Sequence, residues 1–181
     1  MFGYKKSCES VWGGTCILKF VVIFVRMIQV DSVYTGGKRY LWYIIDYLQK
    51  EVEMQGIKED ETGVWSFWTH LNIILEDPQF TLYACDGQGE LVGYMVVNRD
   101  LIREYKESGL ELNLILFEVL PKYRAMGYGR EMINWVKEAA KHRGYSKINL
   151  EATDESFEFW KRMGFSVRIY ELLGRCSMFF E

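Results

Sequence analysis

The chain has 181 residues, of which 49% are hydrophobic and 26% are charged. A chain of this length and composition folds as one globular domain with a substantial core, which excludes a disordered protein. Its formal net charge is −3, from 22 basic and 25 acidic residues, whereas a domain built to bind nucleic acid usually carries a basic excess. We therefore expect no nucleic-acid partner.

The cysteines and histidines are too few and too scattered to indicate a metal site or a disulfide framework. The chain has two histidines and four cysteines, and the cysteines form no C-x-x-C pair. Structural zinc sites use such residues at short, regular spacings. We therefore expect no metal, and we expect free thiols in a reducing, cytoplasmic compartment.

The N-terminal 26 residues are predicted to form an extension or an extra strand, followed by the main domain at residues 27–181. Residues 17–30 form an apolar run, but its uncharged stretch between Lys19 and Arg26 has only six residues. A membrane span needs about 20 apolar residues, and no small-residue cleavage pattern follows the run. We predict one buried or half-buried strand here, and no membrane partner.

Two helices are predicted next along the chain. Apolar residues at helical spacing indicate a first helix over residues 38–55, and Gly56 follows it as a stop signal. Its predicted core face consists of Leu41, Ile44, Ile45, Leu48 and Val52. A second helix is predicted over residues 64–76, where Pro78 ends it.

From residue 80 onward the pattern is mainly that of strands. Two strands, 80–85 and 90–98, are predicted to form a hairpin around the turn 86–89, since Asp and Gly tolerate positive φ. The later elements are a strand at 110–120, a helix at 129–143, a strand at 147–152, a short helix at 155–163, and one or two strands within 166–180. This order predicts a mixed α/β domain.

The loop between the 110–120 strand and the third helix has the features of an anion-binding site. It reads R-A-M-G-Y-G over residues 124–129. The first N–H groups of a helix have no partner within the helix, and the helix dipole adds positive potential there. Gly127 and Gly129 have no Cβ, which lets a phosphate approach the backbone, and Arg124 adds a cation. From these residues alone, a plain two-glycine turn is the alternative.

Residues 117–165 resemble the acyl-CoA-binding core of the GCN5-related N-acetyltransferase (GNAT) superfamily. The loop 124–129 matches the family's R/Q-x-x-G-x-G/A motif, and Val119-x-Pro121-x-x-Arg124 is similar to its usual lead-in. The segment F-W-K-R-M-G-F at 159–165 is similar to the family's aromatic-Tyr-x-x-x-Gly-Phe signature. The resemblance implies a mixed, mostly antiparallel sheet of six to seven strands flanked by about four helices.

The resemblance also implies a reaction, in which a primary amine attacks the thioester of acetyl-CoA directly and no enzyme nucleophile is needed. The pyrophosphate of acetyl-CoA would rest on the loop and the start of the helix, namely Arg124, Ala125, Met126, Gly127, Tyr128, Gly129 and Arg130. The pantetheine arm would run beside the preceding strand, so that the N–H of Val119 stabilises the developing oxyanion. Trp160 would lie beside the sulfur.

The attacking amine must first lose a proton, because a primary ammonium has a pKa of about 10. Two carboxylates are candidates for the base. Glu151 aligns with the base that some family members carry, and Glu118 lies directly beside Val119. Water or another group remains the third alternative.

The chain departs from the family pattern at two positions, where Trp160 replaces the usual Tyr and Thr153 replaces a frequent Asn. The family's Tyr protonates the leaving thiolate or hydrogen-bonds its sulfur, whereas an indole N–H can donate a hydrogen bond but is not an acid at ordinary pH. A second function therefore stays open, that of a catalytically weak or inactive acyl-CoA-binding module that acts through protein contacts. The sequence does not identify the acceptor, which could be a small amine, a lysine side chain or a protein N-terminus, and it leaves a homodimer open.

Overall fold

The computed structural model describes residues 3–8, 18–23, 25–30, 35–55, 80–98, 110–170 and 175–181. The strands are β1 (Gly3–Cys8), β2 (Leu18–Ile23), β3 (Arg26–Gln29), β4 (Thr81–Gly87), β5 (Glu90–Val97), β6 (Glu111–Val119), β7 (Lys147–Thr153), β8 (Ser166–Tyr170) and β9 (Arg175–Phe180). The helices are α1 (Thr35–Gln55), α3 (Tyr128–Arg143), α4 (Asp154–Arg162) and the short 3₁₀ turn η1 (Pro121–Tyr123).

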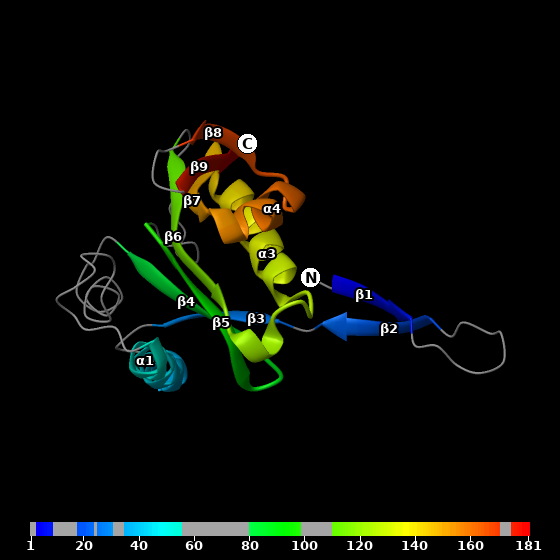
Figure 1. Cartoon of the computed structure of the whole chain (residues 1–181), viewed down its shortest axis with the longest axis vertical. Helices are drawn as coiled ribbons and strands as arrows, with labels where there is room; N and C mark the ends of the chain where they lie inside the picture. Colours follow the sequence, from blue (N-terminus) through cyan, green and yellow to red (C-terminus); the bar gives the residue numbers. More distant parts are fainter. Residues whose placement is uncertain are drawn as a thin grey trace.

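Seven of the described strands form one mixed sheet in the order β3-β4-β5-β6-β7-β9-β8. All the pairings in this sheet are antiparallel except β6 with β7. Helix α1 covers one face of the sheet, and α3 and α4 cover the other (Figure 1). This confirms the predicted fold class.

The apolar run at residues 17–30 is two strands, so the prediction of one strand is wrong. β2 pairs with β1 in a separate two-stranded sheet, and this pairing ends at Gly3 opposite Ile23. β3 begins at Arg26, where it pairs with Asp86 at the edge of the large sheet. The run is divided because β2 pairs with β1 and β3 pairs with β4. The pattern of apolar residues within the run does not specify these pairing partners.

The other predicted elements lie close to the observed ones. α1 begins at Thr35, three residues before the predicted start, and the predicted turn 86–89 is shorter because Asp86 and Gly87 belong to β4. The predicted second helix, residues 64–76, lies outside the described residues. None of the helices that the structure describes is long and apolar enough to cross a membrane.

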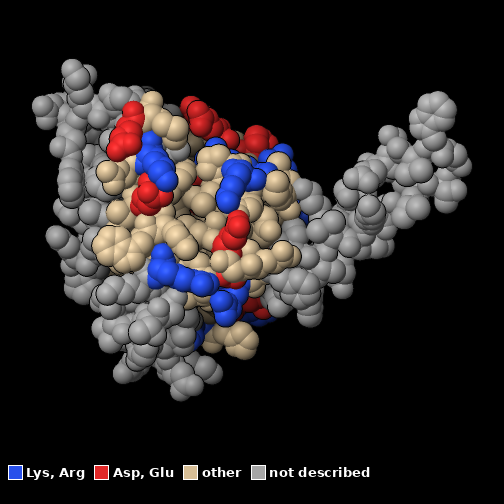
Figure 2. Space-filling model, turned by 90° about the horizontal axis from the view of Figure 1, so that it is seen from below, with Lys and Arg blue, Asp and Glu red and all other residues tan. Residues whose placement is uncertain are grey.

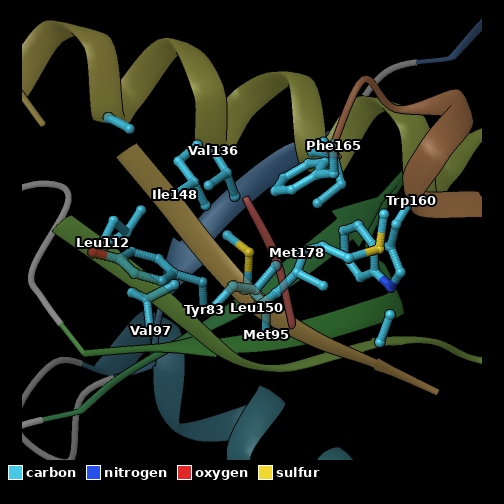
Figure 3. Close-up of a cluster of buried hydrophobic side chains, with 14 of the residues drawn as sticks. Tyr83, Met95, Val97, Leu112, Val136, Ile148, Leu150, Trp160, Phe165 and Met178 are labelled. Atoms are coloured by element: carbon cyan, nitrogen blue, oxygen red, sulfur yellow. The ribbon is translucent and has the colours of Figure 1, made fainter. Parts of the chain in front are cut away.

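The sheet has a hydrophobic cluster on each face because alternate residues of its strands point to opposite sides. In β4, Leu82 and Ala84 pack under α1, whereas Tyr83 packs under α3 and α4. Figure 3 shows the second cluster, in which Val136 of α3 and Trp160 of α4 lie over the side chains of β4 to β7 and β9. Both helical layers are therefore held by the same central strands.

Candidate active site

The site is formed where strands β6 and β7 separate. These parallel strands pair only from Glu111 to Leu114 of β6 and from Lys147 to Leu150 of β7. Beyond that point β6 stays with β5 and β7 stays with β9, so the two strands diverge. A cavity of about 1030 Å³ opens between them, lined by residues 114–119 of β6, residues 150–153 of β7, the loop before α3, and α4.

Beyond Leu114, the edge of β6 on the side of this cavity pairs with no other strand among the described residues, and we call it the free edge. The N–H of Leu120 donates to the carbonyl of Val92 in β5 at 2.9 Å. The carbonyl oxygen of Glu118 also lies on the β5 side, because a Cβ added to Gly93 of β5 would come within 2.4 Å of it. Successive residues of an antiparallel strand direct their N–H and C=O groups to alternate sides. The N–H and C=O groups of Phe117 and Val119 therefore face away from β5, toward β7 and the cavity.

The N-terminus of α3 closes one end of the cavity. Its N-cap residue, Gly127, has a left-handed backbone with φ of 95°, and no side chain caps the helix. Ala125 also has a positive φ, of 58°. The first N–H groups of the helix, on Tyr128 and Gly129, have no acceptor within the helix. The loop therefore has the backbone form of an anion cradle, which consecutive turn and left-handed residues produce.

The structure gives another reason for a glycine at position 129 than the phosphate contact that the sequence suggested. A Cβ at this position would lie 3.3 Å from the ring of Phe159 and 3.4 Å from Cγ2 of Val119. Glycine there lets α3 pack closely on β6 and α4. Of the two glycines in the motif, Gly127 is required by backbone conformation and Gly129 by packing.

Three arginines lie around the cavity. Arg124, Arg130 and Arg162 all line it. The guanidinium of Arg124 is bonded to β6, since Nε donates to the carbonyl of Val119 at 3.0 Å and Nη2 lies 2.7 Å from Oε1 of Glu118. On the face of the molecule in Figure 2, Lys and Arg alternate with Asp and Glu and do not form a continuous basic surface.

The two carboxylates proposed as bases, Glu118 and Glu151, lie on the same face of the sheet, one on each side of the cavity. Phe117 packs on Phe159 and Trp160 of α4, so its neighbour Glu118 points to the opposite face. Leu150 and Ala152 belong to the cluster under α4, so Glu151 between them also points to the opposite face. Both carboxylates line the cavity.

Trp160 is part of the hydrophobic core as well as the cavity wall. Only 5% of the residue is exposed. Its ring lies edge-on to Phe117, Phe159 and Phe165, with ring centroids 5.2, 5.0 and 5.3 Å apart. Figure 3 shows Trp160 and Phe165 in this cluster. An aromatic–aromatic arrangement of this kind fixes the orientation of the indole.

Among the described lining residues, Tyr123 is the one with a phenol group. Its hydroxyl donates to Oε2 of Glu90, near the loop end of the cavity. Burial raises the pKa of Tyr123, the hydrogen bond to Glu90 raises it further, and Lys122 acts in the opposite direction. Tyr123 is therefore a weaker acid than an ordinary phenol, and its hydroxyl is bonded to Glu90.

Glu131, in the first turn of α3, is a buried carboxyl group outside the cavity. Only 7% of the residue is exposed, and burial raises the pKa of its carboxyl, while the neighbouring Arg130 acts in the opposite direction.

Within the described ranges, no group of three or more His, Cys, Asp or Glu side chains could hold a metal ion.

Most of the predicted site residues line the cavity, whereas Met126 and Tyr128 do not, and the prediction named only Trp160 on the wall that α4 forms. Ser156, Phe159, Trp160 and Met163 of the α4 region line the cavity together. Their spacing of i, i+3, i+4 and i+7 is that of one helical face, which was the signal available in the sequence. Arg162 also lines the cavity and was not predicted.

Comparison with known proteins agrees with this architecture. A sequence model of the Acetyltransferase (GNAT) family matches residues 39–165. No curated protein sequence gives a significant match. Solved structures with the same fold include Ard1 from Thermoplasma volcanium, with 19% identity over 86% of this chain and 96% of that chain and a TM-score of 0.55.

Two further solved structures contain bound ligands. The PaiA N-acetyltransferase from Thermoplasma acidophilum, in complex with coenzyme A, has 14% identity over 86% of this chain and 98% of that chain, with a TM-score of 0.57. Arabidopsis thaliana NAA60, in complex with a bisubstrate analogue, has 15% identity over 87% and 97%, with a TM-score of 0.54. At these identities the likeness concerns the fold, whereas the family match covers more than half of the sequence. The chain belongs to the GNAT family of acetyltransferases, which use acetyl-CoA as the acyl donor.

Proposed function

We propose that this protein transfers an acetyl group from acetyl-CoA to a primary amine. The observation that carries the proposal is the separation of β6 from β7 after Leu114 and Leu150, which opens a cavity between a free strand edge and the N-terminus of α3. The free edge suits an extended amide-containing arm, and the helix N-terminus with its arginines suits a diphosphate. Coenzyme A contains both groups, joined in that order.

The residues of the loop and β6 have distinct parts in this proposal. The N–H groups of residues 126–129, with Arg124 and Arg130, bind the diphosphate. The N–H of Val119, which faces the cavity, donates to the carbonyl oxygen of the thioester and stabilises the negative charge that develops there. Acetyl-CoA supplies the activated acyl group. The ring of Trp160 forms the wall beside the sulfur and excludes water.

The carboxylate face of the cavity receives the amine. Glu151 accepts the proton that the ammonium must lose, directly or through water, and Glu118 is the alternative base. The amine nitrogen then forms a bond to the acyl carbon, and the bond from that carbon to sulfur breaks. A thiolate is a good leaving group, so an acid at the position of Trp160 is helpful rather than required.

A second function is favoured by one observation, the burial of Trp160 in an aromatic cluster. If no phenol protonates the leaving thiolate, the protein would be an acyl-CoA-binding module with little or no turnover, acting through protein contacts. One experiment separates the two functions. The protein is incubated with acetyl-CoA and one amine at a time, and the release of free thiol is measured. The amines are a polyamine, an aminoglycoside, a lysine peptide and peptides with free N-termini.

Thiol release that depends on one amine supports the enzyme. Tight binding of acetyl-CoA without thiol release for any amine supports the binding module. Absence of binding to both acetyl-CoA and CoA in calorimetry contradicts both functions. The comparison with CoA matters because it removes the acetyl group and keeps the diphosphate that the loop is proposed to bind.

A further inference from the structure

The side chain of Arg124 links the anion-binding loop to the end of β6. Its Nε donates a 3.0 Å hydrogen bond to the carbonyl oxygen of Val119, and its Nη2 lies 2.7 Å from Oε1 of Glu118. Arg124 itself begins the loop that leads into α3. One guanidinium is thus bonded to the strand edge and to a carboxylate of the cavity at the same time.

Both contacts occupy atoms that the proposed reaction needs. The carbonyl of Val119 faces the cavity and is an acceptor for an amide N–H of a ligand lying along the strand edge. Glu118 is on the carboxylate face of the cavity, where an ammonium would bind. While Arg124 holds these two groups, neither is fully available to a substrate.

A more highly charged anion can compete with Glu118 for the guanidinium of Arg124. The side chain of Arg124 is 59% exposed and that of Glu118 is 30% exposed, and ion pairs with such exposure are weak. A diphosphate carries more charge than a carboxylate, and the planar guanidinium binds phosphate oxygens in a bidentate manner. Arg124 also lines the cavity next to the loop N–H groups. A diphosphate in the loop would therefore lie within the range of this side chain.

We propose that Arg124 is a positioning residue that exchanges partners when the acyl donor binds. In the arrangement that the structure shows, it holds Glu118 and the carbonyl of Val119. When a diphosphate enters the loop, the guanidinium moves to it, which releases the carbonyl for the pantetheine arm and the carboxylate for the amine. The acceptor subsite is then completed only after the donor has bound, and this inference rests on the proposed function.

The exchange has a thermodynamic consequence that can be measured without turnover. If the ion pair between Arg124 and Glu118 must break when the donor binds, the pair opposes donor binding. Removing the charge of Glu118 must then raise the affinity for the donor. If Arg124 instead stays on Glu118, removing Glu118 would leave the affinity unchanged or weaken it. The sign of the effect of one substitution therefore distinguishes the two cases.

The test is a calorimetric titration with CoA at 0.15 M salt of the wild type, Glu118→Gln, Arg124→Gln and the double variant. We expect Glu118→Gln to bind CoA about two- to fivefold more tightly, the range that the energy of an exposed ion pair allows. In the Arg124→Gln background, the same substitution should change the affinity less than about 1.5-fold, because the competing contact is already absent. Circular dichroism melts establish that each variant is folded.

Glu155→Gln is the matched control. Glu155 lines the same cavity, and it forms no ion pair with Arg124 in the part of the chain that the structure describes. Its substitution removes one negative charge and reports the general electrostatic effect on an anionic ligand. The inference is overturned if Glu118→Gln binds CoA no more tightly than Glu155→Gln, or if the gain persists without Arg124.

A crystal structure with CoA is the second measurement. Nη2 of Arg124 should then lie beyond about 4 Å from the carboxylate of Glu118, the limit for an ion pair, and within hydrogen-bond distance of a phosphate oxygen. A retained contact with Glu118 overturns the exchange. A wild type that does not bind CoA overturns the proposed function itself, which is distinct from a wild type that binds CoA and shows no coupling between Arg124 and Glu118.

Discussion

The hydroxyl of Tyr40, in the first half of α1, donates a hydrogen bond to Oδ2 of Asp86 at the end of β4. Tyr40 is fully buried and Asp86 is 6% exposed. The carboxylate also accepts the N–H of Gly89 at 3.1 Å and lies 3.5 Å from Nη2 of Arg39. The pair ties α1 to the β4–β5 hairpin through groups 46 residues apart.

Replacing Tyr40 by Phe should destabilise the protein by about 1–3 kcal/mol, because the buried carboxylate of Asp86 would lose its hydroxyl donor. The free energy of unfolding in urea measures this. Tyr43→Phe is the control, since Tyr43 is 53% exposed on the same helix, and it should change stability by less than about 0.5 kcal/mol. Equal effects of the two substitutions would contradict the role of the pair.

Substitutions at Ala125 and Gly127, in the loop before α3, should change the stability of the protein in opposite directions. Both residues have a left-handed backbone, which is costly for alanine but not for glycine. Ala125→Gly removes that cost, whereas Gly127→Ala adds about 1–2 kcal/mol. We expect Gly127→Ala to lower the melting temperature and Ala125→Gly to raise it or leave it unchanged. Thermal melts with and without CoA measure both effects. A stable Gly127→Ala variant with normal CoA affinity would show that the loop tolerates another conformation.

Trp160 should be required mainly for packing. Trp160→Ala removes a buried ring and should cost about 3–5 kcal/mol in the free energy of unfolding. Trp160→Tyr should keep the fold and maintain or raise turnover, because it adds an ionisable hydroxyl. A wild type that is inactive and becomes active as Trp160→Tyr would favour the binding module. Loss of most activity in Trp160→Tyr would indicate a specific role for the indole.

Glu151→Gln should lower kcat by more than it weakens CoA binding, because Gln keeps the shape of the side chain but cannot accept a proton. The pH profile of kcat/KM for the wild type and the variant is the measurement, and the variant should lose the acidic limb. Glu118→Gln provides the comparison. If that substitution removes the acidic limb and Glu151→Gln does not, Glu118 is the base.

Cys85 should make the stability of the protein depend on pH in the alkaline range. Burial raises the pKa of this thiol from its ordinary value of 9.0 to about 12, and the charge of Asp86 adds to the effect. The unfolded chain releases the proton at lower pH than the folded one, so the thiol's contribution is complete below pH 9 and is lost as the pH rises toward 12. Between these values the slope should approach about 1.4 kcal/mol per pH unit.

The check on Cys85 is a comparison of urea unfolding at several alkaline pH values for the wild type and Cys85→Ala. Tyrosines and lysines titrate in the same pH range in both proteins. The difference between the two curves of unfolding free energy against pH therefore isolates the contribution of the Cys85 thiol. The difference should shrink as the pH rises. A constant difference would show that Cys85 ionises equally in the folded and unfolded chains.

Local sequence patterns predict most of the described helices and strands, and they single out the loop before α3 as a candidate anion-binding loop. Periodic apolar residues define α3, and Gly144 after its last turn adopts the left-handed conformation that ends a helix. The loop 124–129 could be recognised because a helix start, two glycines and an arginine are all encoded within a few residues. The family could be recognised for the same reason, since its motifs are short and local.

Which of these residues lie around one cavity depends on contacts between segments that are distant in the sequence. The separation of β6 from β7 depends on β7 pairing with β9, whose residues come about 30 positions later in the chain. That pairing places Glu151 of β7 on the same face of the sheet as Glu118 of β6, while Trp160 packs on the other face. The partner of a strand is chosen by complementary faces along the whole sheet, so a residue's neighbours across the cavity are not encoded in its own segment.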